Sequence, residues 1–176
     1  VGRFVQKFSI SRLKKDENVY LIAVTKQSFN ELSKSINKPI YLPNGVDREM
    51  FKPRNFENEI IKIGYIGFLE TYGTDKGVLS SVKEIAKINN NIRTNTLIVG
   101  GPKRKIEEIN NYIEEISQKE NFTINELVPH SKVPELISSL NIGIVPYPNE
   151  KHMNLYASPL KIFEFASCGV PVLISN

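Results

Sequence analysis

From residue 60 onward, short apolar runs alternate with amphipathic helical stretches, and this alternation limits the possible folds more than any other feature of the chain. The apolar runs are brief, rich in β-branched residues and ended by Gly, Pro or polar clusters, as buried parallel strands are. The expected strands are residues 60–68, 95–101, 121–125, 141–147 and 170–175. Strands that alternate with helices predict an α/β fold with a Rossmann-like, doubly wound parallel sheet.

The stretches between these strands carry apolar stripes at helical spacing. Two long helices are expected over residues 76–88 and 103–120, and two shorter ones within 131–140 and 158–167. Their apolar residues recur three or four positions apart, with charged residues around the rest of each helix. The two long stripes are Val78, Val82, Ile85 and Ala86, and Ile106, Ile109, Ile113 and Ile116.

The first forty residues have a different organisation. We expect a helix over residues 1–15, a strand over 19–24 and a second helix over 25–36. Thr25 is placed to cap the second helix, because threonine is a favoured N-cap residue. Two helices around one strand cannot close a core alone, so this part is interpreted as a fragment of another domain.

Residues 41–59 are expected to be an interdomain linker. They are rich in proline, contain an Asn-Gly turn at 44–45, and place Asp47 where it can cap a short helical turn. The predicted organisation is therefore the end of one domain over residues 1–40, the linker, and a main domain over 60–176. Because the sequence stops directly after a strand, we expect the main domain to be truncated at its C-terminus.

Composition excludes several classes of protein. Of the 176 residues, 40% are hydrophobic and 24% are charged, and no apolar run reaches the ~20 residues of a membrane-spanning helix. The single cysteine, Cys168, gives no disulfide framework and fits a reducing compartment, so a cytoplasmic location is expected. The net charge of +4 is spread over scattered lysines. Nucleic-acid-binding proteins usually have a clustered basic stripe, so no nucleic-acid partner is expected.

The start of the last expected helix carries opposite charges in an otherwise apolar segment. Ser158 is a favoured N-cap and Pro159 is favoured at the first helical position, so the amides of Leu160 and Lys161 would point outward. With the helix dipole and the lysine ammonium, these amides would attract a phosphate. Glu164, one turn further on, could accept hydrogen bonds from hydroxyl groups. A site that binds a phosphate and, beside it, a diol matches the shape of a nucleotide. The alternative interpretation is that Lys161 and Glu164 form an ordinary surface ion pair.

Two strand ends favour the nucleotide. Gly67 ends the first strand of the main domain, and the following loop brings Lys76 to the next helix. Ligands of open parallel sheets bind at the carboxyl ends of strands near the switch point, so Lys76 and Lys161 would converge on one diphosphate. The second strand ends in Gly100-Gly101, where missing side chains would let a ligand approach. The alternative for Lys76 is a solvated lysine in a loop, and the alternative for Gly100-Gly101 is a plain turn.

Five segments carry a resemblance to a known family. They are PNGVDREMF, IGYIGFLETYGTDKGV, TLIVGG, NELVPHSKVPELISSLNIGIVPYP and SPLKIFEFASCGVPVLIS. In this order they resemble the donor-binding half of family-4 retaining glycosyltransferases, which have the GT-B fold. The similarity covers about residues 40–176, and its last segment is the most specific. The first forty residues look like the end of the acceptor-binding half.

The resemblance implies an activity and several site residues. It implies metal-independent transfer of a hexose, with retention, from a nucleotide diphosphate-sugar of the UDP or GDP type to a glycan or lipid-linked acceptor. No further cofactor is implied. By the resemblance, Glu164 holds the ribose hydroxyls, and Lys76 binds the diphosphate together with the backbone of Leu160 and Lys161. The catalytic groups are expected in the domain that precedes residue 1.

The resemblance also assigns the base and shows two departures. Val128 and Pro129, after the third strand, lie where the family holds the base by main-chain contacts. Tyr156 stands where the family has the first glutamate of a pair, so the sugar contact at this donor-site position is absent or remade. Phe68 and Leu69 stand where an arginine is usual. The diphosphate would therefore be held by fewer side chains.

A metal site finds no support in the sequence. A metal-dependent transferase needs paired acidic ligands, and the three aspartates, Asp16, Asp47 and Asp75, lie far apart. His130 and His152 lack a cysteine or carboxylate at ligand spacing and are expected at the surface or in loops. His130 lies beside the proposed base pocket, and a contact of its side chain with the ligand is the less favoured interpretation.

Other functions on the same fold stay open to different degrees. A dinucleotide oxidoreductase is disfavoured, because Gly64 and Gly67 form no G-x-G-x-x-G motif. A sugar-nucleotide epimerase of GT-B type and a non-catalytic nucleotide-sugar binding module remain as alternatives. The amphipathic start of the chain, with Phe4 and Phe8 on its apolar face, allows peripheral contact with the inner face of a membrane. Packing of that face on another domain is the favoured alternative.

Overall fold

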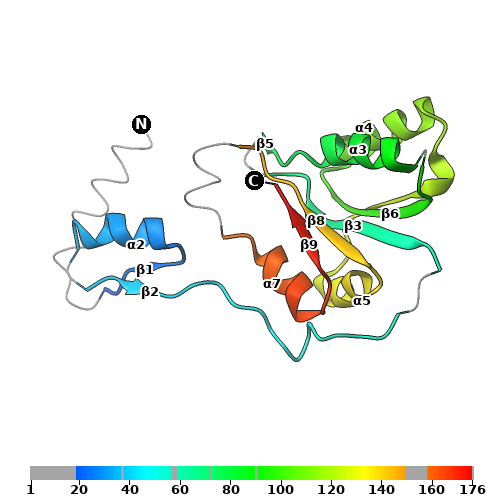
Figure 1. Cartoon of the computed structure of the whole chain (residues 1–176). Coiled ribbons are helices and arrows are strands. Elements are labelled where there is room, and N and C mark those ends of the chain that lie inside the picture. Colours follow the sequence, from blue (N-terminus) through cyan, green and yellow to red (C-terminus); the bar gives the residue numbers. More distant parts are fainter. Residues whose placement is uncertain are drawn as a thin grey trace. The chain divides into compact units, whose positions relative to one another are not determined.

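The structure is a computed structural model in which residues 19–36, 38–56, 59–71, 73–89, 91–149 and 158–175 are described. These residues form two compact units. Unit 1 contains the described residues up to Asn44 together with Ser158, and unit 2 contains those of Gly45–Asn149 and from Pro159 onward. Figure 1 shows the elements of both units. Among the described residues, no helix is long and apolar enough to cross a membrane.

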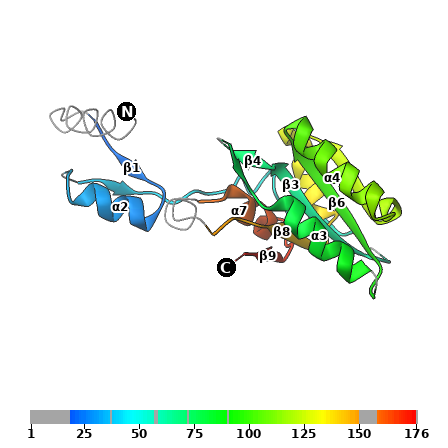
Figure 2. The same ribbon diagram turned by 90° about the horizontal axis from the view of Figure 1, so that it is seen from above.

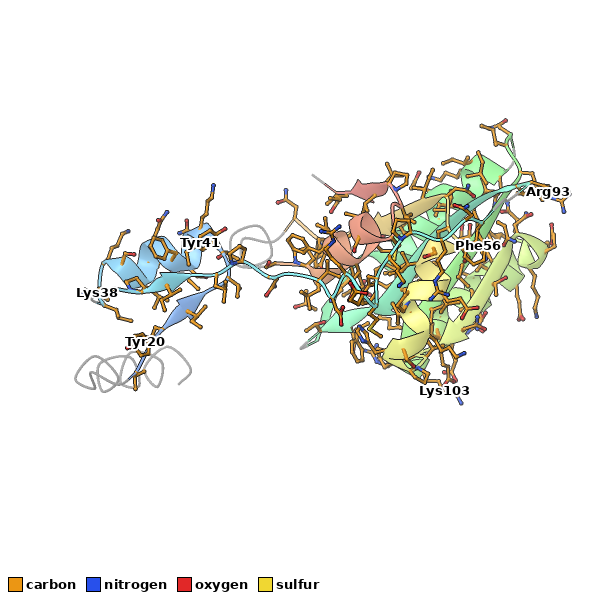
Figure 3. All side chains as sticks on the ribbon, turned by 90° about the horizontal axis from the view of Figure 1, so that it is seen from below. Tyr20, Lys38, Tyr41, Phe56, Arg93 and Lys103 are labelled. Carbon is orange, nitrogen blue, oxygen red and sulfur yellow. The ribbon has the colours of Figure 1, made fainter. Side chains whose placement is uncertain are left out.

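The described residues of unit 1 form a helix between two short parallel strands. Its elements are β1 (Ile22–Ala23), α2 (Lys26–Ser33) and β2 (Ile40–Tyr41). The cap by Thr25 is confirmed, because its side-chain oxygen accepts a hydrogen bond from the amide of Ser28 at 3.1 Å. The sequence did not indicate β2, which carries Tyr41 (labelled in Figure 3). The Tyr41 ring packs against Phe29 of α2, with ring centroids 5.9 Å apart. The helix expected over residues 1–15 lies outside the described residues.

Unit 2 is built on a parallel sheet with the strand order β7-β6-β3-β8-β9. The strands are β3 (Ile61–Phe68), β6 (Thr94–Gly101), β7 (Phe122–Glu126), β8 (Ile142–Val145) and β9 (Val172–Ile174). All the expected strands are confirmed, with ends shifted by one or two residues. Because β3 comes first in the sequence and lies between β6 and β8, the switch point lies at the β3–β8 pair.

Helices cover both faces of this sheet (Figures 1 and 2). They are α3 (Val78–Asn89) and α4 (Lys103–Glu115) on one face, and α5 (Val133–Ser138) and α7 (Leu160–Ser167) on the other. Neighbouring residues of β3 serve the two faces in turn: Tyr65 joins the core under α3 and α4, and Ile66 joins the core with Phe165 of α7. The doubly wound α/β prediction is confirmed.

The apolar stripes occupy the expected positions, but α4 is shorter than predicted. The stripe of α3 is buried as expected, and in α4 Ile106, Ile109 and Ile113 are buried. α4 ends at Glu115, and Ile116, the C-cap residue, is partly buried against the same core. Ser117 then adopts φ +56°, a left-handed conformation that stops a helix. A short 3-10 turn, η1 (Lys119–Asn121), follows.

Part of the expected linker packs into unit 2. Asp47 caps a short turn as expected, because its Oδ1 accepts hydrogen bonds from the amides of Glu49 and Met50 at 2.9 and 3.2 Å. Phe51 is 2% exposed and lies in the core beside α7. Its carbonyl oxygen accepts a hydrogen bond from Ser167 Oγ at 2.5 Å. Burying an aromatic ring stabilises this packing, so the compact unit begins near Gly45 rather than at residue 60.

Candidate functional site

The carboxyl end of β3 is built around Gly67 and the side chain of Lys161. Gly67 has φ +138°, a conformation that L side chains rarely adopt. A Cβ added to Gly67 would lie 2.3 Å from Lys161 Nζ and 2.4 Å from its Cε. The lysine side chain, which comes from the first turn of α7, therefore runs directly over the main chain of β3. Glycine is required here by both the backbone conformation and this close approach.

The ammonium of Lys161 lies over an aromatic ring. Its Nζ is 5.5 Å from the ring centroid of Tyr65, in the range of a cation–π contact. Tyr65 is 1% exposed, and its hydroxyl donates a hydrogen bond to the carbonyl oxygen of Phe68 at 2.5 Å. Burial raises the pKa of Tyr65, so the phenol stays a neutral donor. One side chain thus holds both the lysine and the chain that leaves β3.

Lys76 comes from the segment after β3 and lies close enough to Lys161 for its charge to act on that side chain. Lys76 Nζ lies 5.6 Å from the ring centroid of Tyr147, which follows β8. Burial lowers the pKa of Lys76 and raises that of Tyr147. The pKa of Lys161 is lowered to about 8, first by burial and then by the charge of Lys76, while Glu164 opposes the shift. Two like charges that are partly removed from water and close together favour the binding of an anion.

The start of α7 differs from the prediction. The helix begins at Leu160, with Pro159 as the N-cap residue at φ −70° and ψ 110°, and no side chain caps it among the described residues. The expected cap by Ser158 is wrong: this residue belongs to unit 1, where its carbonyl oxygen accepts a hydrogen bond from Asn44 Nδ2 at 3.0 Å. The expected helical position for Pro159 is also wrong, because its ψ is extended.

The first-turn amides of α7 have no side-chain partner in the part of the chain that the structure describes. Amides in the first turn of a helix have no intrahelical acceptor. Leu160 is 49% exposed, and Lys161 follows it in the same turn. The positive end of the helix dipole lies at the same point. Among the described residues, no side chain caps these expected anion-binding amides.

Glu164 lies one turn deeper in α7. Its side chain is 17% exposed, and its Oε1 is 3.6 Å from His130 Nε2. This separation is too long for a good hydrogen bond but close enough for an ion pair when the imidazole is protonated. His130 begins the short turn η2 and directly follows Val128 and Pro129. The structure therefore brings Glu164 to the segment expected to hold the base.

The two glycines at the end of β6 lie against leucine side chains of the same chain. A Cβ on Gly100 would lie 2.1 Å from Leu69 Cδ1, and one on Gly101 would lie 3.0 Å from Leu127 Cδ1. The space that the glycines leave is thus filled by leucine side chains of the same chain. These glycines allow close packing of the loops around the site, and a direct approach of a ligand to them stays a prediction.

The sequence did not indicate the two aromatic rings at the site. Tyr156 lies outside the described residues. The rings of Tyr65 and Tyr147 were missed, although Tyr65 and Gly67 are two apart on a strand and therefore face the same side. That spacing could have indicated that a side chain covering the glycine also lies over the ring. Among the described residues, no three His, Cys, Asp or Glu side chains are grouped to hold a metal ion.

A known family matches this region. The sequence model described as Glycosyl transferases group 1 covers residues 61–176. The chain belongs to this family. No curated protein sequence matches the chain at a significant level. The family match includes the whole cluster of Gly67, Lys76, Lys161 and Glu164.

Solved structures similar to this group 1 glycosyltransferase chain share its fold. Sucrose-phosphate synthase from Thermosynechococcus elongatus is 20% identical with a TM-score of 0.68, over 94% of this chain and 42% of its own. A glycosyltransferase from Rickettsia africae is 16% identical with a TM-score of 0.69, over 89% and 44%. HepE of Anabaena, in complex with UDP and glucose, is 12% identical with a TM-score of 0.64, over 96% and 47%.

These likenesses establish the architecture of unit 2. The α/β sheet with helices on both faces matches the Rossmann-like domains of GT-B glycosyltransferases. The chain spans less than half of the length of the three solved structures.

Proposed function

We propose that unit 2 binds the nucleoside diphosphate part of a nucleotide-sugar donor, in a retaining glycosyltransferase that transfers a hexose to a glycan or lipid-linked acceptor. The observation that carries this proposal is the convergence of two lysines, Lys76 and Lys161, at the switch point of the sheet. Their ammonium groups come from different elements, and the charge of one lowers the pKa of the other. A diphosphate is the anion that such a pair, in a group 1 glycosyltransferase, is suited to hold.

The diphosphate is the leaving group of sugar transfer, and the site is arranged to stabilise its charge. As the bond between sugar and diphosphate breaks, negative charge grows on the leaving oxygen. The two ammonium groups and the first-turn amides of Leu160 and Lys161 are fixed before the reaction, so they stabilise this charge without reorganising. This set of groups could supply the charge that a metal ion supplies in other transferases, which supports the metal-independent mechanism.

Glu164 is proposed to bind the ribose. Its carboxylate lies one helical turn beyond the expected phosphate position and is partly exposed. An ionised carboxylate accepts hydrogen bonds from two neighbouring hydroxyl groups, which would select a nucleotide over free pyrophosphate. Main-chain groups of Val128 and Pro129 would then hold the base. The similar fold of HepE, solved with UDP and glucose, supports a donor of the UDP type.

The transfer step needs groups beyond this cluster. We assign the catalytic groups and the acceptor site to an acceptor-binding half of the GT-B kind. Tyr156 stands in place of the first glutamate of the family, and we propose it as a donor-site residue on the resemblance alone. A cytoplasmic location, with contact to the inner face of the membrane where lipid-linked acceptors are found, stays a prediction from the sequence.

Calorimetric titration of the chain with UDP, GDP and pyrophosphate tests the proposal. We expect one of the two nucleotides to bind more tightly than pyrophosphate, because Glu164 adds contacts to the ribose. We also expect pyrophosphate to bind, and Lys161→Met to weaken all three ligands, because they share the diphosphate. A chain that binds none of the three up to millimolar concentration would contradict the proposed function.

A further inference from the structure

The segment that carries Lys76 is more ordered than the plain loop that the sequence suggested. Residues after β3 form a small antiparallel hairpin, β4 (Glu70–Thr71) and β5 (Thr74–Asp75). Lys76 follows β5 directly, and Gly77 begins the approach to α3. Whatever fixes the hairpin therefore also fixes the point from which the Lys76 side chain starts.

An ion pair from α4 holds the end of this hairpin. Lys105 Nζ lies 2.6 Å from Asp75 Oδ2 and 2.7 Å from Glu108 Oε2, and the Lys105 side chain is only 15% exposed. Arg104, its neighbour, pairs with Glu70 at the other strand of the hairpin. The hydrogen bond to Asp75 is the largest of the effects that raise the pKa of Lys105. The start of α4 thus contacts both strands.

Asp75 connects this ion pair to the backbone around Lys76. Its second oxygen, Oδ1, accepts a hydrogen bond from the amide of Gly77 at 2.6 Å. Burial alone would raise the pKa of Asp75, but the hydrogen bonds from Lys105 and from the Gly77 amide hold it below its ordinary value. The carboxylate is therefore ionised at neutral pH and bridges α4 to the residue that follows Lys76.

The main chain on the other side of Lys76 is held as well. The Lys76 amide donates to the carbonyl oxygen of Leu69 at 2.9 Å, and the Leu69 amide donates to that of Gly101 at 2.7 Å. Gly101 is the last residue of β6. Lys76 is therefore fixed through the sheet on one side and through Asp75 and Lys105 on the other.

We propose that Lys105 is a positioning residue for the donor diphosphate. Its ammonium holds Asp75 in place, and this fixes the direction in which Lys76 leaves the hairpin toward Tyr147 and Lys161. Lys105 does not bind the diphosphate itself, because two carboxylates already share its charge. The inference rests on the proposed function, since it concerns the same ligand.

The expected effect falls on binding more than on folding. An ion pair near the surface contributes little to stability. The affinity for a ligand, in contrast, falls when the main chain that carries a binding charge becomes mobile, because binding must then order that segment. Lys105→Met should weaken pyrophosphate binding by about fivefold, and by no more than Lys76→Met does.

Calorimetry with pyrophosphate on matched variants tests this inference. Lys103→Met is the control, because Lys103 lies on the same helix (labelled in Figure 3). Its side chain is 72% exposed, and its contact with Glu107, at 4.0 Å, is a long one. This variant removes the same charge from the same helix without touching the hairpin. We expect wild-type affinity for Lys103→Met and for Lys105→Arg, which restores the ion pair. In a Lys76→Met background, Lys105→Met should cause no further loss.

A second variant covers the case in which Lys105→Met does not fold. Asp75→Asn removes the ion pair with Lys105 but keeps an oxygen for the Gly77 amide, and it should cause the same loss of affinity. Wild-type affinity in Lys105→Met or Asp75→Asn would overturn the inference while leaving the proposed function intact. The inference would also be overturned if Lys105→Met weakened pyrophosphate binding as much in the Lys76→Met background as in the wild type. Failure of the wild type to bind pyrophosphate would instead contradict the proposed function.

Discussion

Gly67→Ala should disable the proposed diphosphate site through a single methyl group. The new Cβ would lie 2.3 Å from Lys161 Nζ and 2.4 Å from its Cε, closer than the 3.0 Å limit that real Cβ contacts respect. The atoms in the way are the far end of a flexible side chain, so Lys161 would swing away and the fold would survive. The φ of +138° adds backbone strain of about 1–3 kcal/mol for any residue with a Cβ.

The loss of affinity follows from the displaced ammonium. A hydrogen bond to a charged group contributes about 1.5–3 kcal/mol. Moving the Lys161 ammonium out of the site should therefore weaken pyrophosphate binding by about 10- to 150-fold. In a Lys161→Met background the same alanine should cost almost no further affinity, because the group that it displaces is already absent.

Gly169→Ala is the matched control for backbone strain. Gly169 also has a positive φ, +75°, but a Cβ there would meet only Pro53, at an ordinary 3.7 Å. Urea unfolding should show a loss of stability in both alanine variants, and calorimetry should show weakened pyrophosphate binding in Gly67→Ala alone. Unchanged affinity in Gly67→Ala, or equal losses in both variants, would refute the reasoning.

Three further predictions concern stability. Burial lowers the pKa of Lys161 in the folded chain from 10.5 to about 8, so between these two pH values the unfolded chain binds more protons than the folded chain. The free energy of unfolding should therefore rise between pH 8 and 10.5, by on the order of 2 kcal/mol relative to Lys161→Met. Urea titrations at several pH values can check this. Thr96→Val should stabilise the fold by about 1 kcal/mol in urea, because the buried Thr96 hydroxyl has no hydrogen-bond partner among the described residues, and a clear loss would contradict this. Gly143→Ala should destabilise by about 1–3 kcal/mol, because its Cβ would lie 2.6 Å from the ring of Phe165 at the β8–α7 contact, and an unchanged midpoint would count against that packing.

The sheet and its helices could be predicted because their sequence pattern is periodic. The stripe of α3 and the β-branched runs gave the correct elements, and the strand order then placed Lys76 and Lys161 at one switch point. Ser117 shows the limit of this reasoning. Its left-handed conformation ends α4 early, and no local residue preference indicates it.

The parts of the site that the sequence did not reveal depend on contacts between distant elements. The spacing of Tyr65 and Gly67 places both on one side of β3, but the sequence does not show that the Lys161 side chain of α7 is the one that covers them. The close contact of Gly100 with Leu69 joins two loops that are distant in the sequence, so the sequence alone did not indicate it. Phe51 likewise looked like part of a linker, although it fills a core position.

The comparison of a nucleoside diphosphate with pyrophosphate on the Glu164→Gln variant tests the central claim most directly. If two lysines hold the diphosphate and Glu164 holds the ribose, this variant should lose at least about tenfold in affinity for UDP or GDP, whichever binds the wild type better. Its affinity for pyrophosphate should stay equal or increase, because a negative charge has been removed beside the anion. Equal losses for both ligands, or unchanged nucleotide affinity, would contradict the account.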